Sequence, residues 1–349
     1  MKTSLKTVLT FILLFTFVLS GDSESCTRVV YKGPNNTILT ARSMDWESEI
    51  PANLWIMPRG TERSGEAGPN SVKWKSKYGS IVTSSFNIAS SDGMNEKGLV
   101  ANMLWLVESK YSEFDGSQKG LSIALWAQYV LDNFATVEEA VSEISKREFA
   151  VVSTVIPGTD IFTSIHLSIS DAKGDNAIFE YIDGQLVIHH SMDYTVMTNS
   201  PVFEKQLALD DYWKQIGGTV MLPGTNRAAD RFARASFYIT AVLQTDEIQK
   251  AVAAVFSVIR NCSVPFGFST PNEPNISSTR WRTVSDQKNR VYYFENVLTP
   301  NTFWVDITKA DFSENAPVKM LKLENNEIYT GDALSSFVVT EQFKFAGLE

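Results

Sequence analysis

The chain has 349 residues, of which 44% are hydrophobic and 20% charged, and its formal net charge is −9. This acidic balance argues against a surface that binds nucleic acid or an anionic membrane. The composition is that of an ordinary globular protein, without a long linker, a low-complexity tract or an internal repeat.

The first 25 residues have the features of a secretory signal. Lys2 and Lys6 form a short basic start, residues 8–19 form an apolar run, and residues 20–25 are small or polar. The apolar run is too short to cross a bilayer, which takes about 20 helical residues. We therefore predict export to the periplasm or out of the cell, removal of residues 1–25, and no stable membrane insertion. Residues 26–349 are then expected to form a single domain.

Cys26 is expected to become the first residue of the mature protein. Ser23 and Ser25 are small residues at the −3 and −1 positions of a cut after Ser25. A terminal cysteine carries a thiol and a free α-amine, and an amine that titrates near 8 can act as a base toward the thiol. This combination suits amide hydrolysis. An earlier cut, for instance after Ser20, would leave residues 21–25 to be removed by the enzyme itself.

Two other interpretations of Cys26 stay open on these residues alone. One is a lipid anchor, although lipoprotein signals usually have a Leu-like residue at −3 and a small one at −2, where this chain has Ser23 and Glu24. The other is a disulfide with Cys262, the only other cysteine, since exported proteins can form disulfides. Two cysteines are a sparse framework, however, and the sequence around Cys262 is typical of core packing at a helix end.

Strand patterns dominate the segment that follows Cys26. We predict strands over residues 27–32 and 37–46, joined by a turn sequence at residues 33–36. Two more strands are predicted over residues 80–88 and 98–107, around a turn at residues 92–97.

Helix patterns fill the middle of the chain, and strands return toward its end. Predicted helices cover residues 121–134, the segment after Thr136 with Glu139 completing a capping box, and residues 228–243 and 246–261. Predicted strands cover residues 163–170, 176–182, 185–189, 280–284, 290–295 and 302–306. Residues 205–218 could form an assembly arm or a surface helix. The pattern favours an α+β fold, a four-layer αββα sandwich of two antiparallel sheets between helices.

The sequence does not indicate metal or serine chemistry. It contains no HExxH, CxxC or GxSxG motif, and it has three histidines. His166, His189 and His190 lie in strand patterns and are interpreted as polar strand positions. We expect neither a metal ion nor an organic cofactor.

Four further residues are ambiguous by themselves. Arg42 and Asp45 stand three apart and would face opposite sides of a regular strand, so either the strand ends or bends between them or only one reaches Cys26. A surface ion pair would explain them equally well. Asn199 is in a turn-like strand end and Arg231 in a helix start, where a turn former and a solvated arginine are the default interpretations.

Several segments together resemble one family. In chain order they are Cys26-Thr27-Arg28, residues 42–46 (RSMDW), 92–99 (DGMNEKGL), 197–201 (MTNSP), 222–225 (LPGT) and 230–232 (DRF). Their order and spacing resemble the choloylglycine hydrolase family, which includes the penicillin V acylases and bile salt hydrolases, over essentially the whole mature chain. The resemblance implies an N-terminal-nucleophile hydrolase with an αββα fold, and a homotetramer, which is usual in that family.

The resemblance also implies catalytic roles. Cys26 would be the nucleophile and, through its α-amine, the base, and Asp45 would hold that amine or the thiol. Arg42 and Arg231 would tune the charge around the sulfur, since a nearby guanidinium favours the thiolate. The side chain of Asn199 would donate a hydrogen bond to the tetrahedral oxyanion.

The second oxyanion donor would be the backbone N–H of Trp105, at a position where the family often has Asn or Tyr. With Trp46, Trp105 would also bind substrate, because two indoles beside the nucleophile suit an aryl or long acyl group. This pairing is most similar to Gram-negative penicillin V acylases, members of which also cleave acyl-homoserine lactones. The alternative is that both tryptophans are core residues, given their apolar neighbours.

Three hypotheses follow. The first is an exported amidase that hydrolyses small linear amides, such as penicillin V or acyl-homoserine lactones, through a thioester. The second is a conjugated bile salt hydrolase with the same chemistry. The third is a catalytically idle exported binding protein, anchored by a lipid on Cys26.

Overall fold

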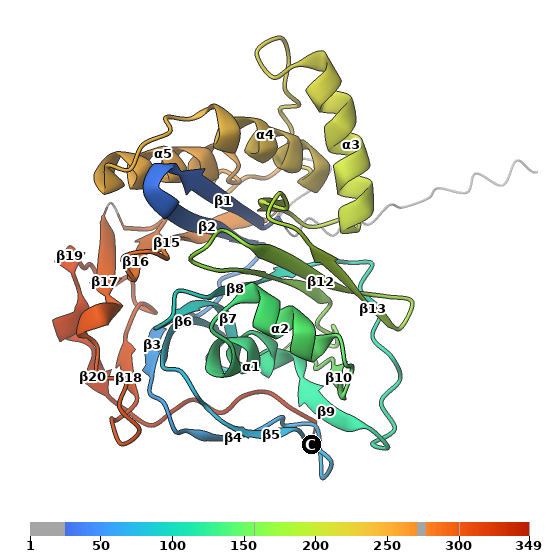
Figure 1. Cartoon of the computed structure of the whole chain (residues 1–349), viewed down its shortest axis with the longest axis vertical. Helices are drawn as coiled ribbons and strands as arrows, with labels where there is room; N and C mark the ends of the chain where they lie inside the picture. The colour runs from blue at the N-terminus through green and yellow to red at the C-terminus, as the bar shows by residue number, and fades with distance from the viewer. Residues whose placement is uncertain (1–24, 157, 271–276, 300, 349) are drawn as a thin grey trace, which may run out of the picture.

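Two β-sheets lie face to face, with helices on the outer side of each (Figure 1). The computed structural model describes residues 25–156, 158–270, 277–299 and 301–348, so the predicted signal at residues 1–24 lies outside them. The order of layers is helices, seven-stranded sheet, nine-stranded sheet, helices. The predicted αββα sandwich of the α+β class is therefore confirmed.

The seven-stranded sheet contains the predicted N-terminal hairpin. Its order is β14 (Val196–Met197), β1 (Thr27–Gly33), β2 (Thr37–Trp46), β15 (Ser278–Asp286), β16 (Val291–Asn296), β17 (Thr302–Asp306) and β19 (Gly331–Asp332). Neighbouring strands are antiparallel except for β17 and β19. Helices α4 (Ala228–Ala241) and α5 (Ile248–Asn261) pack on β1, and α5 also packs on β2. Helix α3 (Phe203–Ile216) packs on α4 and projects from the body (Figure 1).

The nine-stranded sheet is antiparallel throughout. Its order is β13 (Gln185–His190), β12 (Asn176–Ile182), β11 (Ile165–Ser170), β8 (Val100–Trp105), β7 (Ala89–Asn95), β6 (Ser80–Ser85), β3 (Leu54–Met57), β18 (Lys319–Leu321) and β20 (Val338–Val339). Helix α1 (Trp126–Asn133) packs on β7 and β8, and α2 (Val137–Ile144) on β12. Two small ribbons pair β4 (Glu62–Ser64) with β5 (Lys73–Lys75), and β9 (Lys119–Ser122) with β10 (Phe149–Val152).

Local sequence explains several boundaries. The side chain of Thr136 accepts a hydrogen bond from Glu139 N at 3.2 Å, so the predicted cap of α2 is confirmed. Asn35 and Asn36 adopt φ angles of 52° and 55° in the turn between β1 and β2, a conformation that asparagine tolerates well. Residues 205–218 are largely helical, within and just beyond α3.

Two predictions of local structure are wrong. The turn predicted at residues 92–97 begins too early, because residues 92–95 belong to β7 and the reversal before that strand is made by Phe86 and Asn87, with φ angles of 54° and 52°. The helix predicted over residues 121–134 starts only at Trp126, since residues 119–122 form β9 and a short 3-10 turn follows. No helix in the described ranges is long and apolar enough to cross a membrane.

Candidate active site

The β1–β2 hairpin brings Cys26 against Arg42. Cys26 directly precedes β1, and the antiparallel register pairs Thr27 with Ser43 and Arg28 with Arg42. The Cys26 side chain is 2% exposed, and its Sγ lies 3.7 Å from Arg42 Nη2. The same sulfur lies 3.9 Å from Met44 Sδ. The turn at residues 33–36 thus sets the register that joins the two residues.

Arg42 is fixed by backbone oxygens from the facing sheet. Its Nη1 donates to Ser91 O at 3.0 Å and its Nη2 to Met103 O at 2.8 Å, while Asp92 Oδ2 lies 3.9 Å from Nη1. Arg42 is 1% exposed, so the interpretation as part of a surface ion pair with Asp45 is wrong. The guanidinium is held rigidly beside the sulfur.

Burial and charge act in opposite directions on the thiol. Burial raises the pKa of Cys26, and the positive charge of Arg42 offsets this only in part, so the net pKa is raised. The guanidinium lowers the pKa of Cys26 as expected, but burial raises it by more. With Ser25 joined to Cys26, the thiol is therefore protonated at neutral pH, and a base is needed to make it a nucleophile.

Cys262 is not the partner of Cys26. Both cysteines are free, so the disulfide interpretation is wrong. Cys262 lies fully buried at the end of α5, as core packing requires, and burial raises its pKa to about 11.

Asp45 lies on the other face of β2. The strand continues through Trp46 without a break, so the side chains of Arg42 and Asp45 point to opposite sides. The Asp45 carboxylate accepts hydrogen bonds from Ser43 Oγ at 3.1 Å and from Thr279 Oγ1 of β15 at 2.5 Å. Burial raises its pKa to about 6, although the charge of Arg231 acts to lower it. The backbone oxygen of Asp45 lies 3.9 Å from Cys26 Sγ.

Arg231 ties helix α4 to the start of β1. It is fully buried, so the interpretation as a solvated arginine is wrong. Its Nη1 donates to Cys26 O at 2.5 Å and to Thr27 Oγ1 at 2.6 Å, and its Nη2 donates to Asn199 Oδ1 at 2.8 Å. Burial lowers the pKa of Arg231, while the nearby charge of Asp45 raises it. One planar side chain thus bridges the cysteine and Asn199.

The amide of Asn199 is oriented by its two partners. Because Oδ1 accepts from Arg231, Nδ2 faces Trp105, and it donates to Trp105 O at 2.8 Å. Leu106 N donates to Ser164 O, so the neighbouring N–H and C=O of Trp105 point away from β11, toward the side of β7, beyond the last residue of β8 that pairs with it. The N–H of Trp105 and one hydrogen of Asn199 Nδ2 are therefore on the same side of β8.

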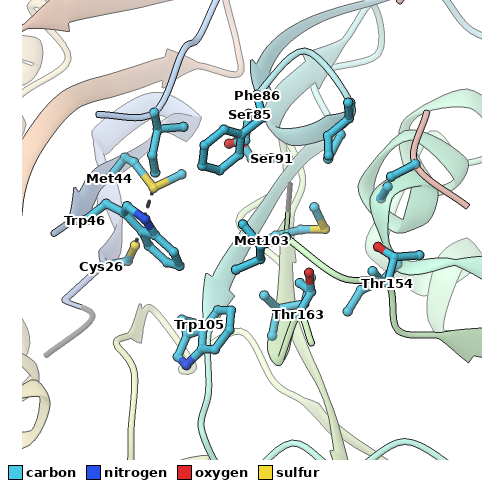
Figure 2. A pocket seen from close by; sticks show the side chains of 18 of the residues that line it. Cys26, Met44, Trp46, Ser85, Phe86, Ser91, Met103, Trp105, Thr154 and Thr163 are labelled. Carbon is cyan, nitrogen blue, oxygen red and sulfur yellow. Dashed lines mark hydrogen bonds between the residues drawn. The ribbon is translucent and has the colours of Figure 1, made fainter. Parts of the chain in front are cut away.

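An apolar pocket of about 110 Å³ opens beside the sulfur (Figure 2). Trp46 and Trp105 line it and meet edge to face, with ring centroids 5.5 Å apart and an interplanar angle of 71°. Both are partly buried and pack against the hydrophobic core as well as lining the pocket, so the core and pocket interpretations of the two tryptophans each hold in part. Among the described residues that line it, Arg42 is the one with a charged side chain; the other members are Cys26, Met44, Ile50, Ser85, Phe86, Ile88, Ala89, Ser91, Met103, Ile123, Ala124, Thr154, Val155, Ile156, Thr163, Ile165 and Ala346.

Sequence reasoning did not identify the residues that support the site. Thr279 lies 234 positions from Asp45, and no local signal links them. Asp92 does lie in a matched segment, and it accepts from Asn102 Nδ2 at 2.6 Å and from Tyr292 Oη beside Arg42. Among the described residues, no group of three His, Cys, Asp or Glu could hold a metal ion.

Residues 26–320 match a family described as linear amide C–N hydrolases, choloylglycine hydrolase family. The chain belongs to the choloylglycine hydrolase family. It is accordingly a linear amide hydrolase, as the resemblance in the sequence predicts.

Individual members of the family agree with this assignment. A penicillin V acylase from Pectobacterium atrosepticum is 51% identical over 353 aligned residues, which cover 94% of each chain. The structure of penicillin V acylase from Agrobacterium tumefaciens matches with a TM-score of 0.87 and 60% identity, over 93% of this chain and 100% of that one. A variant conjugated bile acid hydrolase from Clostridium perfringens shares the fold, with a TM-score of 0.73 and 22% identity over 88% and 98% of the two chains.

Proposed function

We propose that the protein is an exported amidase in which Cys26 is the nucleophile, and that it hydrolyses amides of the penicillin V or acyl-homoserine lactone type. The observation that carries the proposal is the position of Cys26 Sγ, 3.7 Å from the Arg42 guanidinium and at the wall of an apolar pocket. The identity of 51% and 60% to proteins named penicillin V acylase supports the same reaction.

Activity requires removal of the residues before Cys26, and we place the cut after Ser25. In the full chain the nitrogen of Cys26 belongs to a peptide bond and cannot act as a base. Burial keeps the thiol protonated, so the freed α-amine is the group that would take its proton. Removal of residues 1–25 as an export signal would supply that amine, in the periplasm or outside the cell.

The proposed reaction is a two-step acyl transfer. Cys26 Sγ adds to the amide carbonyl as its proton passes to the α-amine, and the oxyanion accepts hydrogen bonds from Asn199 Nδ2 and Trp105 N–H. The protonated amine then gives its proton to the leaving nitrogen, and the C–N bond breaks to leave a thioester. Water, deprotonated by the same amine, hydrolyses the thioester and restores the thiol.

The pocket favours an aryl or alkyl acyl group. Its lining is apolar or hydroxylic apart from Arg42, and the indoles of Trp46 and Trp105 offer flat apolar surfaces next to the sulfur. A hydroxylated steroid would leave several of its oxygens without strong partners in such a lining. Conjugated bile salts are therefore the second candidate, tested alongside the first.

We also propose that the enzyme is a homotetramer assembled through α3. This helix projects from the body (Figure 1), and it presents Leu209 and Tyr212 with 43% and 59% of their surface exposed. Val220 and Met221, just beyond α3, are exposed to 79% and 58%. Apolar side chains gathered on one projecting element are typical of an interface.

The test joins N-terminal analysis to substrate assays. The exported protein is analysed by intact mass and N-terminal sequencing, and amine release is measured from penicillin V, decanoyl-homoserine lactone and glycocholate. We expect a free Cys26 terminus, hydrolysis of one or both of the first two substrates, and no hydrolysis by Cys26→Ser. Cys262→Ser is the matched control and should retain activity.

Other outcomes are equally informative. A preference for glycocholate would identify a bile salt hydrolase with the same nucleophile. An acylated Cys26 without hydrolysis of any of the three amides would overturn the amidase proposal and favour a lipid-anchored binding protein.

A further inference from the structure

A buried histidine and glutamate lie behind the Asn199 turn, and the proposed mechanism does not use them. His166 on β11 and Glu180 on the adjacent strand β12 are each 1% exposed. His166 Nδ1 lies 3.0 Å from Glu180 Oε1, and His166 Nε2 lies 2.8 Å from the backbone oxygen of Thr198. Thr198 directly precedes Asn199, so the pair contacts the segment that supplies the proposed oxyanion donor.

The partners of His166 fix its protonation state. A backbone carbonyl can only accept a hydrogen bond, and an ionised carboxylate can only accept as well. Burial raises the pKa of Glu180, but the hydrogen bonds that its oxygens accept together outweigh burial and lower the pKa to about 2, so the carboxylate is ionised. Phe203 N also donates to both Glu180 oxygens at 3.1 Å. The two ring nitrogens of His166 thus face two acceptors, and both acceptors receive a hydrogen bond only from an imidazolium.

The contact to Thr198 bears directly on Asn199. The Thr198–Asn199 segment is also held by Gln206 Nε2 of α3, which donates to Thr198 Oγ1 at 3.2 Å and to Asn199 O at 3.1 Å. Arg231 also donates to this segment, at Asn199 Oδ1, but His166 supplies the hydrogen bond to the backbone carbonyl of Thr198, and charged donors form the stronger bonds. A neutral ring would leave either Thr198 O or Glu180 without its donor.

We propose that the His166 imidazolium, held by Glu180, is a positioning residue for the oxyanion hole: it fixes the carbonyl of Thr198 and thereby aims Asn199 Nδ2. This inference rests on the proposed role of Asn199 as an oxyanion donor. A buried pair that only stabilised the fold would affect the reaction independently of Asn199. A positioning role requires that the effect of His166 on the reaction depend on Asn199.

A double-mutant cycle tests this coupling. His166→Gln, Asn199→Ala and the double variant are compared in kcat and KM on whichever of the three amides the wild type hydrolyses. We expect His166→Gln to lower kcat by roughly tenfold to a hundredfold while KM changes by less than about threefold. In the Asn199→Ala background the same substitution should lower kcat by less than about threefold, because the donor that it positions is already absent.

The matched control is His190→Gln. His190 also pairs with a carboxylate, with Nε2 2.8 Å from Asp175 Oδ2, but it is more exposed and neither group has a described contact with Thr198. Its kcat should stay within about twofold of the wild type. Equal losses of kcat from His166→Gln in both backgrounds would overturn the proposal, since the histidine would then act independently of Asn199.

A second readout does not depend on turnover. The chain has three histidines, so ¹⁵N-histidine labelling with His166→Gln for assignment gives a simple NMR spectrum. We expect both ring nitrogens of His166 to be protonated at pH 7.

A neutral His166 in an active wild type would overturn this inference alone. Absence of any amide hydrolysis by the wild type would instead overturn the proposed function, and with it the catalytic meaning of the pair, whatever the NMR spectrum shows.

Discussion

The surroundings of Cys26 are set by charged groups from two separate elements, β2 and α4. The Arg42 guanidinium of β2 contacts the sulfur, and Arg231 of α4 donates to the backbone oxygen of Cys26. Asp45 lies on the opposite face of β2 from Arg42, in a buried setting that raises its pKa. Arg42 and Asp45 thus lie on opposite faces of β2, and each of the three charged residues can be replaced separately.

The raised pKa of Asp45 predicts a pH-dependent stability. With a folded pKa of about 6 against an ordinary value near 3.9, the folded state binds the proton more tightly than the unfolded state. The wild type should therefore gain stability relative to Asp45→Asn as the pH falls from 7 to 4, by up to about 3 kcal/mol. Urea unfolding at several pH values measures this difference, with both proteins retaining Ser25 so that Cys26 has no free α-amine. A gap between the two proteins that stays constant across these pH values would show that Asp45 has no raised pKa.

Arg231 should not be replaceable by lysine. Its planar fork reaches Cys26 O, Thr27 Oγ1 and Asn199 Oδ1, and a single ammonium cannot donate to all three from one position. We expect Arg231→Lys to lower kcat on penicillin V by about a hundredfold, because Asn199 loses the donor that orients its amide. Steady-state kinetics and the melting temperature are measured together.

Arg234→Lys is the matched control for this substitution. Arg234 is also buried in α4, but its Nη1 donates to Pro223 O and Thr225 O, away from the cysteine. Its replacement should lower the melting temperature while kcat stays within about threefold of the wild type. Similar losses of kcat in both variants would mean that Arg231 acts only through the stability of α4.

Sequence alone selected residues that the structure brings together around Cys26, but not their surroundings. Cys26, Arg42, Asn199 and Arg231 could be selected because each lies in a segment with a recognisable pattern. Burial of Arg231 was not predictable, because a helix start looks the same whether it faces water or a sheet. His166 resembled an ordinary polar strand residue, since its partners come from β12 and the segment after β14.

Among the elements, those with strong local signals were predicted, including strands that pair over long range such as β15, whereas several short strands were not. Helices α4 and α5 begin and end within two residues of the prediction because their apolar periodicity is regular. By contrast, the sequence predicts that a helix begins within the segment that forms β9. This strand pairs in parallel with β10, which follows α1 and α2 in the chain. Its short apolar run fits a strand or a buried helix equally well, so only the pairing decides.

Helix α3 leads to a prediction about assembly. If it forms the interface of a homotetramer, replacing its exposed apolar residues should weaken association, since their burial is what stabilises the interface. We expect Leu209→Ser combined with Tyr212→Ser to shift the protein to smaller species in size-exclusion chromatography with light scattering. Ile328→Ser is the control, because Ile328 is 62% exposed but lies outside α3. A tetramer that survives the double substitution, or a wild type that is monomeric, would refute this role.

At the scale of the whole molecule, the pocket depends on segments that are distant in the sequence. Figure 2 shows Cys26, Met44 and Trp46 on one side and Thr154 on the other. Ala346, near the end of the chain, also lines the pocket. Its N donates to Ile88 O at 2.9 Å, and its O accepts from Ser122 Oγ at 2.5 Å. Because Ser122 precedes the lining residue Ile123, Ala346 belongs to the wall formed with the region before α1, rather than to the β2 wall beside Cys26.

A larger side chain at position 346 should therefore shorten the acyl group that the enzyme accepts. The backbone there is held on both sides, so a leucine has to extend into a cavity of only about 110 Å³. We expect Ala346→Leu to lower kcat/KM for decanoyl amides at least tenfold more than for short acyl amides, since only the longer chains reach this wall.

The measurement is a series of N-acyl homoserine lactones of increasing chain length, which share one leaving amine. Ala346→Gly is the control, because it removes one methyl group without filling the pocket, and it should keep or extend the range of accepted chains. A uniform loss of kcat/KM at every chain length would indicate that Ala346 supports the site near Cys26 and does not limit its depth. A selective loss would instead mean that the segment around Ala346 determines the specificity of the reaction proposed at Cys26.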